Sequence, residues 1–211
     1  MAALISLIGS SGVGKTTLAR ALAKSANFTL ALEQHAERPF QTLLEMDTRY
    51  ALANQMDYLL LRAEQEAALR QSGQIAVLDG GLEMDYHIFT RLFAARALLS
   101  PAEAELCRRL YDFARARLPA PELFILLEAP PEVIRARLMN RQRINIARPD
   151  DIPLIEGFLA DWLRGLPPER LLRLDVSTAA PDYADLLPGL LTTIRARLGL
   201  NSGNYETEYI P

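Results

Sequence analysis

The chain has 211 residues, of which 50% are hydrophobic and 23% are charged, and its formal net charge is −3. This size and composition fit one α/β domain with a substantial core and argue against two domains. The slightly acidic balance gives no reason to expect nucleic acid or an anionic membrane as a partner. Cys107 is the single cysteine, so no intramolecular disulfide can form, and no apolar run approaches the roughly 18 residues of a membrane span. A phosphate-binding motif near the start leaves no room for a signal peptide, and we expect a cytoplasmic protein.

Five short apolar segments with a β-strand composition recur along the chain, and helical periodicity fills the stretches between them. The predicted strands are Leu4–Ile8, Phe28–Leu32, Ile75–Leu78, Leu123–Leu127 and Leu171–Leu174. The predicted helical segments are 15–25, about 39–72, 84–118, 131–143, 152–164 and 182–198. Pro101 divides the third of these near Ser100, which has Glu103 three residues later as in a capping box. Alternating strands and helices predict an α/β fold with a five-stranded parallel sheet flanked by helices on both faces. We assign residues 1–200 to one domain and expect 201–211 to form a mobile C-terminal tail.

The first strand leads into Gly9–Thr16, which reads G-S-S-G-V-G-K-T and matches the phosphate-binding pattern G-x-x-x-x-G-K-[ST]. Its glycines let backbone N–H groups face phosphate oxygens, and the following helix N-terminus adds partial positive charge. Lys15 would contact the β- and γ-phosphates, and the Thr16 hydroxyl would ligate Mg²⁺. A glycine-rich surface turn is the alternative. We expect a nucleoside triphosphate site made by Gly9, Ser10, Ser11, Gly12, Val13, Gly14, Lys15, Thr16 and Thr17.

Acidic residues follow the second and third predicted strands. They are Glu33 and Asp79. In doubly wound sheets ligands bind beyond the carboxyl ends of the strands, so both residues are candidates for chemistry. Four apolar residues followed by Asp79 is the usual form of the second nucleotide motif, whose carboxylate reaches Mg²⁺. Glu33 is a candidate base for the proton of an acceptor hydroxyl. The sequence lacks N-K-x-D, which disfavours a GTPase.

Arginines cluster on the later part of the predicted helix 131–143 and just beyond it. They are Arg135, Arg137, Arg141, Arg143 and Arg148. The spacing of four between Arg137 and Arg141 places this pair on one helical face. Such a face could clamp a transferring phosphoryl group, as an arginine finger does. The alternative is a solvated basic face near a helix C-terminus.

Together these residues resemble the deoxynucleoside kinase family, over the stretch from the phosphate loop to about residue 165. The family motif E-x-x-x-x-N-P-F resembles Glu33–Phe40, and the motif [DE]-R-S-x-x-x-D-x-x-I-F resembles Asp79–Phe89. A family glutamine that is followed seven residues later by an arginine is similar to Gln55 and Arg62. The family's P-[DE]-L strand entry and R-x-x-x-R-x-R lid are similar to Pro121–Leu123 and Arg137–Arg143.

The resemblance implies a P-loop kinase three-layer fold with an arginine-bearing lid at about 137–151, ATP and Mg²⁺ as cofactors, and a homodimer built on the long helices. The apolar stretches around 56–69 and 92–110 are the candidates for its interface. It implies phosphorylation of the 5′-hydroxyl of a deoxynucleoside, a step of nucleotide salvage. Glu33 would be the general base, with Lys15, Arg137, Arg141 and Arg143 acting on the phosphates. Gln55 and Asp85 would contact the base, and Arg62 would brace Asp85.

The chain departs from the family pattern on the sugar side of the site. Gly80 and Gly81 stand where the family has arginine and serine. Ile146 aligns with a family glutamate that reaches the sugar 3′-hydroxyl, and Asp150 or Asp151 is the candidate to replace it. Two alternatives therefore stay open: a P-loop kinase for another small alcohol or a nucleotide, and a nucleotide-binding module with weak catalysis.

Overall fold

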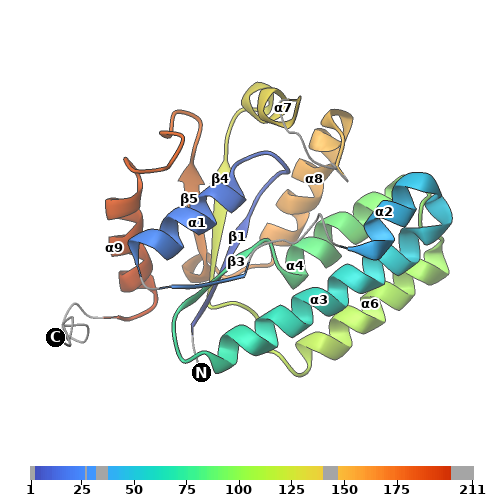
Figure 1. Ribbon diagram of the computed structural model, residues 1–211, viewed down its shortest axis with the longest axis horizontal. Helices are drawn as coiled ribbons and strands as arrows, with labels where there is room; N and C mark the ends of the chain where they lie inside the picture. Colours follow the sequence, from blue (N-terminus) through green and yellow to red (C-terminus); the bar gives the residue numbers. More distant parts are fainter. Residues whose placement is uncertain (1–2, 27, 32–37, 140–146, 201–211) are drawn as a thin grey trace.

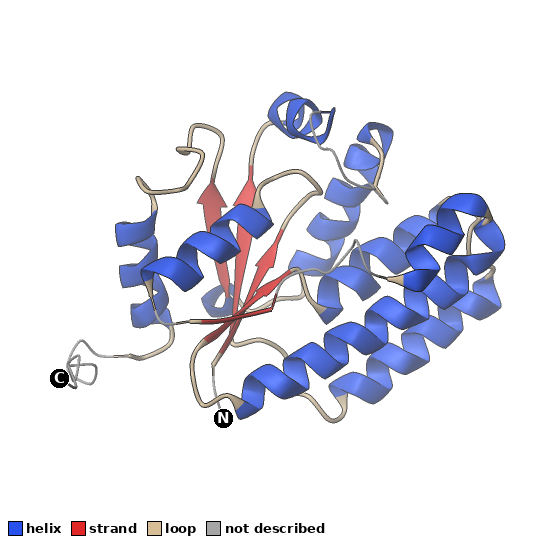
Figure 2. Ribbon diagram, in the orientation of Figure 1, coloured by secondary structure: helices blue, strands red, loops and turns tan. Residues whose placement is uncertain are grey.

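The computed structural model describes residues 3–26, 28–31, 38–139 and 147–200. Within them a parallel five-stranded sheet has the order β2-β3-β1-β4-β5 (Figure 2). The strands are β1 (Leu4–Ile8), β2 (Thr29–Ala31), β3 (Ala76–Asp79), β4 (Leu123–Glu128) and β5 (Leu171–Asp175). The α/β prediction with five parallel strands is confirmed. Glu33, the centre of the expected lid and the tail 201–211 lie outside the described residues.

The central strands β3, β1 and β4 are buried on both faces of the sheet, because these apolar strands send alternate side chains to opposite sides. Ile5 and Leu7 of β1 belong to the core shared with α1 (Lys15–Ser25) and α9 (Leu187–Arg197). The opposite face carries the cores under the long helix α3 (Ala51–Gln71) and under α8 (Ile152–Leu163). Figure 1 shows α1 and α9 on one side of the sheet, and α3 and α8 on the other. This confirms helical layers on both faces.

The predicted helical segment 39–72 is two helices rather than one. The chain forms α2 (Pro39–Met46), a 3₁₀ turn η1 (Thr48–Tyr50) and then α3. The break lies at Asp47, whose backbone is extended and whose side chain accepts a hydrogen bond from the Arg49 N–H. An aspartate in this role offers the backbone an alternative to the helix, which periodicity alone does not reveal.

The predicted segment 84–118 divides as expected, with further detail. The helical structure begins slightly earlier than predicted, with α4 (Leu82–Met84), and continues with a π-helical turn η2 (Asp85–Thr90), α5 (Arg91–Ala95) and α6 (Pro101–Arg115). Ser100 caps α6 in a full capping box with Glu103, as the sequence predicts. Helices α6 and α3 pack against each other beside the sheet (Figure 1).

The remaining helical elements are α7 (Pro131–Met139) and the 3₁₀ turns η3 (Pro149–Asp151) and η4 (Pro168–Arg170). The last predicted helix, 182–198, begins later than expected, at Leu187. Tyr183 has φ of 60°, a left-handed conformation that a helix cannot contain. None of the helices in the described ranges is long and apolar enough to cross a membrane.

Candidate active site

The phosphate loop joins β1 to α1 at the carboxyl edge of the sheet, where the strand order reverses around β1. Gly14 is the N-cap of α1 with φ of 115°, and a Cβ there would lie 2.1 Å from the Tyr183 hydroxyl. Glycine is therefore required at this position. The first turn of α1 carries no acidic side chain, so the positive end of the helix is available to an anion. Lys15 Nζ donates to the carbonyl oxygens of Gly9 at 2.9 Å and Ser10 at 3.1 Å.

Thr16 and Asp79 meet at the edge of this loop, as the two nucleotide motifs predict. The Thr16 hydroxyl donates to Asp79 Oδ2 at 2.5 Å. Asp79 is fully buried, and its other oxygen, Oδ1, has no hydrogen-bond partner among the described residues. A buried carboxylate oxygen without a partner, next to a threonine hydroxyl, fits a hard cation that also takes phosphate and water oxygens. The described residues contain no cluster of three or more histidine, cysteine or acidic side chains, so a dedicated all-protein metal cage is not present in that part.

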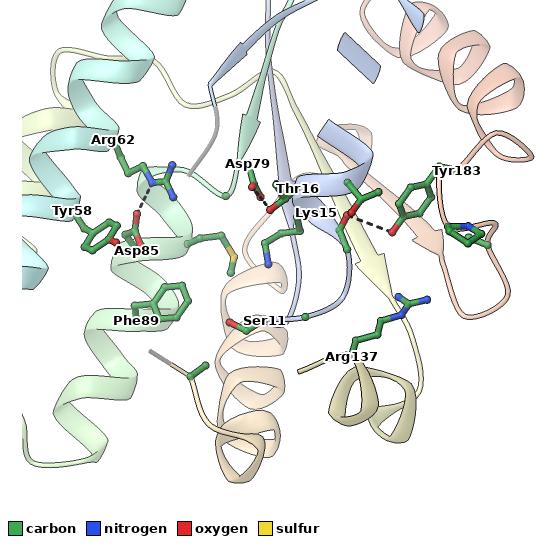
Figure 3. A pocket seen from close by; sticks show the side chains of 18 of the residues that line it. Ser11, Lys15, Thr16, Tyr58, Arg62, Asp79, Asp85, Phe89, Arg137 and Tyr183 are labelled. Carbon is green, nitrogen blue, oxygen red and sulfur yellow. Dashed lines mark hydrogen bonds and ion pairs between the residues drawn. The ribbon is translucent and has the colours of Figure 1, made fainter. Parts of the chain in front are cut away.

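A cavity of about 410 Å³ extends from the phosphate loop to the π turn η2. Lys15, Thr16 and Asp79 lie near its middle, with Tyr58, Arg62, Asp85 and Phe89 at one end and Arg137 and Tyr183 at the other (Figure 3). The further lining residues are Ser11, Gly12, Gly14, Thr17, Gln55, Gly80, Met84, Ala147, Ala179, Ala180 and Pro181. The cavity thus joins the phosphate loop to the polar and aromatic side chains of α3 and η2 in one continuous space.

The end formed by α3 and η2 contains a buried ion pair. Arg62 Nε lies 2.8 Å from Asp85 Oδ2, and these side chains are 1% and 6% exposed. The predicted pair is therefore present, and Gln55, also predicted, lines the cavity beside it. Tyr58 and Phe89 were not predicted. Tyr58 follows Gln55 by three residues and precedes Arg62 by four, so helical spacing places all three on one face of α3.

The turn where the family pattern has arginine and serine has a backbone that suits glycine alone. Gly80 has φ of 87°, and Gly81 has φ of 123° with ψ of 179°. The Ser6 hydroxyl donates to the Gly80 carbonyl, and a Cβ on Gly80 would lie 3.4 Å from Arg62 Nη2. This turn therefore requires glycine at both positions.

Behind this turn lies a buried charged cluster that sequence reasoning missed. Arg115 of α6 contacts both carboxylate oxygens of Glu66 at 2.7 Å, and its Nε lies 2.9 Å from Glu83 Oε1. Burial raises the pKa of Glu83 to about 7, with Arg115 opposing the rise and Glu66 adding to it. Glu66 follows Arg62 by four residues, about one helical turn. This spacing could have indicated that Glu66 lies on the same face of α3 as Arg62.

Of the five arginines in the basic cluster, Arg137 is the one that lines the cavity among the described residues. Its guanidinium donates to the carbonyl oxygens of Val13 at 2.8 Å and Val176 at 3.1 Å. Arg137 therefore ties α7 to the phosphate loop and to the end of β5. Arg135 and Arg148 are exposed, whereas Arg141 and Arg143 lie outside the described residues.

The candidate replacement for the sugar-contacting glutamate is already engaged elsewhere. Asp151 is buried and forms an ion pair with Arg96, and it also accepts a hydrogen bond from the Arg148 N–H. Asp150 is exposed. Ile146, the aligned residue, lies outside the described part of the chain. Among the described residues, the polar side chains at this end of the cavity therefore come from α3 and η2.

Comparison with known proteins places this geometry in a family. The family model "Deoxynucleoside kinase" matches residues 5–151. The chain is 27% identical over 143 residues to a deoxyadenosine/deoxycytidine kinase of Bacillus subtilis, a match that covers 66% of this chain and 66% of that protein. It is 26% identical over 147 residues to a deoxyguanosine kinase of the same organism, which covers 67% and 68%. The matched stretch thus spans about two thirds of each relative.

Solved structures show the same fold. A deoxyadenosine kinase from M. mycoides with the products dCMP and a flexible dCDP bound superposes with a TM-score of 0.76 at 15% identity, covering 90% of this chain and 99% of that one. The same kinase with bound dCTP gives a TM-score of 0.74 at 14% identity and the same coverage. The family match, the sheet order and the phosphate loop agree, and the chain belongs to the deoxynucleoside kinase family of phosphotransferases that act on a hydroxyl acceptor.

Proposed function

We propose that the protein transfers the γ-phosphoryl group of ATP, with Mg²⁺, to the 5′-hydroxyl of a deoxynucleoside. The observation that supports this most directly is the shared cavity. One part of it is the phosphate loop, and another is the buried Arg62–Asp85 pair with the aromatic rings of Tyr58 and Phe89. Phosphoryl transfer requires two ligands held in line more than it requires covalent work by the protein.

On the donor side, the loop N–H groups, Lys15 and the N-terminus of α1 would hold the triphosphate. Thr16 and Asp79 would hold Mg²⁺, which neutralises charge on the phosphate oxygens when it is bound. The unpartnered Asp79 Oδ1 supports this assignment. Arg137 would steady the loop through the Val13 carbonyl, and Arg141 and Arg143 of the proposed lid, 137–151, would clamp the transferring group.

On the acceptor side, Gln55 and Asp85 would contact the base, and the flat rings of Tyr58 and Phe89 would pack against it. Arg62 would hold the Asp85 carboxylate in place through a charge-assisted bond. Glu33, outside the described residues, would accept the proton of the attacking hydroxyl. Removing a proton while the phosphoryl group arrives is general-base catalysis.

We further infer a homodimer that acts in the cytoplasm, with a single kinase domain over 1–200 and a tail over 201–211. Leu60 of α3 and Leu106 and Phe113 of α6 are large apolar side chains that are 48%, 39% and 57% exposed on two packed helices. An exposed apolar surface of this kind favours an interface between copies. ATP as donor and a buried lone Cys107 fit the cytoplasm.

The test is acceptor-stimulated release of ADP from MgATP, measured over the four deoxynucleosides, their monophosphates and simple alcohols. Stimulation by a deoxynucleoside, with its 5′-monophosphate as product, is the expected result. Stimulation by monophosphates or simple alcohols in place of deoxynucleosides would overturn the acceptor assignment. ATP binding without stimulated turnover by any acceptor would point to a nucleotide-binding module.

A further inference from the structure

The Gln55 amide has a fixed orientation in this structure, and two residues of the π turn hold it: Asp85 through its backbone carbonyl and Thr90 through its hydroxyl. Gln55 Nε2 lies 2.7 Å from the backbone carbonyl of Asp85 and 3.0 Å from Thr90 Oγ1. The Asp85 carbonyl can only accept, so the amide atom that faces it must be the NH₂ group. Turning the amide over would bring two acceptors within 2.7 Å of each other.

Thr90 completes this arrangement. Its hydroxyl donates to the Asp85 carbonyl at 3.0 Å, so its lone pair is what meets Gln55 Nε2. Both hydrogens of the Gln55 amide are thereby used inside the protein. Gln55 and Thr90 are 2% and 4% exposed, which shields these bonds from competing water. The π turn carries the arrangement, since Asp85 and Thr90 are its first and last residues.

What remains of Gln55 for a ligand is therefore an acceptor. No hydrogen bond to Gln55 Oε1 occurs among the described residues, and the side chain lines the cavity. The neighbouring Asp85 carboxylate, which forms an ion pair with the Arg62 guanidinium, also offers acceptor oxygens. This end of the cavity thus presents two neighbouring acceptor groups and no amide donor.

Resting on the proposed function, we propose that Thr90 makes the protein selective for guanine among the deoxynucleosides. The Watson–Crick edge of guanine has adjacent donors at N1 and N2, which match two acceptors. Adenine and cytosine instead have one donor, the amino group, next to a ring nitrogen with a lone pair, which is N1 in adenine and N3 in cytosine. This lone pair would face the acceptor Gln55 Oε1 or remain unpaired. The O6 carbonyl of guanine needs a donor, and the Arg62 guanidinium, which lines the same cavity, is a group of that kind.

The size of the expected preference for guanine follows from the cost of leaving buried polar groups unpaired. A site built for hydrogen bonding rejects an analogue with the wrong donor and acceptor pattern much more strongly than a hydrophobic pocket does. We therefore expect kcat/KM for deoxyguanosine to exceed that for deoxyadenosine or deoxycytidine by at least about tenfold. Deoxyinosine is the sharpest probe. It shares N1–H and O6 with deoxyguanosine but lacks the N2 amino group, and it differs from deoxyadenosine mainly at the edge that Gln55 would read.

The experiment measures kcat/KM with MgATP for deoxyguanosine, deoxyinosine, deoxyadenosine and deoxycytidine, in the wild type, Thr90→Val and Thr90→Ser. Valine keeps the shape but removes the hydroxyl, so one N–H of the Gln55 amide loses its acceptor and becomes available to a lone pair of the ligand. We expect the deoxyinosine/deoxyadenosine ratio to exceed about ten in the wild type, to persist in Thr90→Ser and to fall about tenfold in Thr90→Val. A wild type that prefers deoxyadenosine or deoxycytidine contradicts the proposal, and so does an unchanged ratio in Thr90→Val.

Calorimetric binding of the same four deoxynucleosides to the wild type separates this proposal from the proposed function. If deoxynucleosides are phosphorylated but adenine is preferred, the kinase assignment stands and the role of Thr90 does not. If none is phosphorylated, the kinase assignment fails, and the ranking of binding affinities still decides the base preference. This ranking is measured on the wild type, so it does not depend on whether the Thr90 variants fold.

Discussion

The turn at Gly80–Gly81 gives a prediction about stability that can be worked out from the backbone. Gly81 has φ of 123° and ψ of 179°, a region that residues with a Cβ essentially avoid. A Cβ there would lie 3.4 Å from Leu78 Cδ1 and from Ser6 Oγ, so crowding adds little and backbone strain dominates. We expect Gly81→Ala to lower the free energy of unfolding by about 1–3 kcal/mol. In a protein of this size that lowers Tm by about 2–12 °C.

The assay is denaturant and thermal unfolding of the wild type and two alanine variants. The matched control is Gly157→Ala, because Gly157 is an exposed residue inside α8 and no heavy atom lies within 4 Å of the position that a Cβ would occupy there. Alanine in a helix interior should raise stability there by about 0.5–1 kcal/mol. A Gly81→Ala protein within about 0.5 kcal/mol of the wild type would refute the account of the turn. It would also mean that the family's serine could stand at this position.

Three further predictions concern the phosphate loop, the proposed general base Glu33 and the pH dependence of stability. Lys15→Ala should abolish most ATP binding and turnover, measured by calorimetry and ADP release, and full activity in this variant would exclude the loop as the ATP site. Glu33→Gln should lower kcat by at least about a hundredfold while ATP affinity is largely kept, and an unchanged kcat would remove Glu33 as the base. Burial lowers the pKa of His87 from its usual 6.5 to about 4, and the nearby Arg91 and Arg115 contribute to the shift. Because the unfolded chain therefore binds the proton at a higher pH than the folded protein does, the free energy of unfolding falls as the pH drops from 6.5 toward 4. His87→Phe, which keeps a ring against Trp162, should flatten the fall of Tm over that range, and an equally steep fall would contradict this role of His87.

Local sequence patterns predicted the parts of the site that local structure determines. The phosphate loop and the Thr16–Asp79 contact follow from motifs that lie at one edge of the sheet, and the Arg62–Asp85 pair follows from the resemblance to the deoxynucleoside kinase family. The capping box at Ser100 is equally local. These features depend on few residues, so a single sequence is enough to indicate them.

Several contacts between distant segments are marked by no motif, and these were not predicted. Tyr183 meets the loop at Gly14 across 169 positions, and Arg115 reaches Glu66 across 49. The orientation of Gln55 depends on Thr90, which lies 35 residues away and beyond an unpredicted π turn. Such contacts are set by the packing of whole elements, and neither periodicity nor motif spacing carries that information.

The central claim is that one cavity brings the γ-phosphoryl group of ATP to a deoxynucleoside hydroxyl. The most direct measurement follows the label from γ-labelled MgATP in the presence of deoxyguanosine and, in separate reactions, of each other deoxynucleoside, with chromatographic separation of the products. The account predicts that the label appears in deoxyguanosine 5′-monophosphate with one ADP formed per labelled product. Label that appears only in inorganic phosphate, or that stays in ATP with every deoxynucleoside, would contradict it.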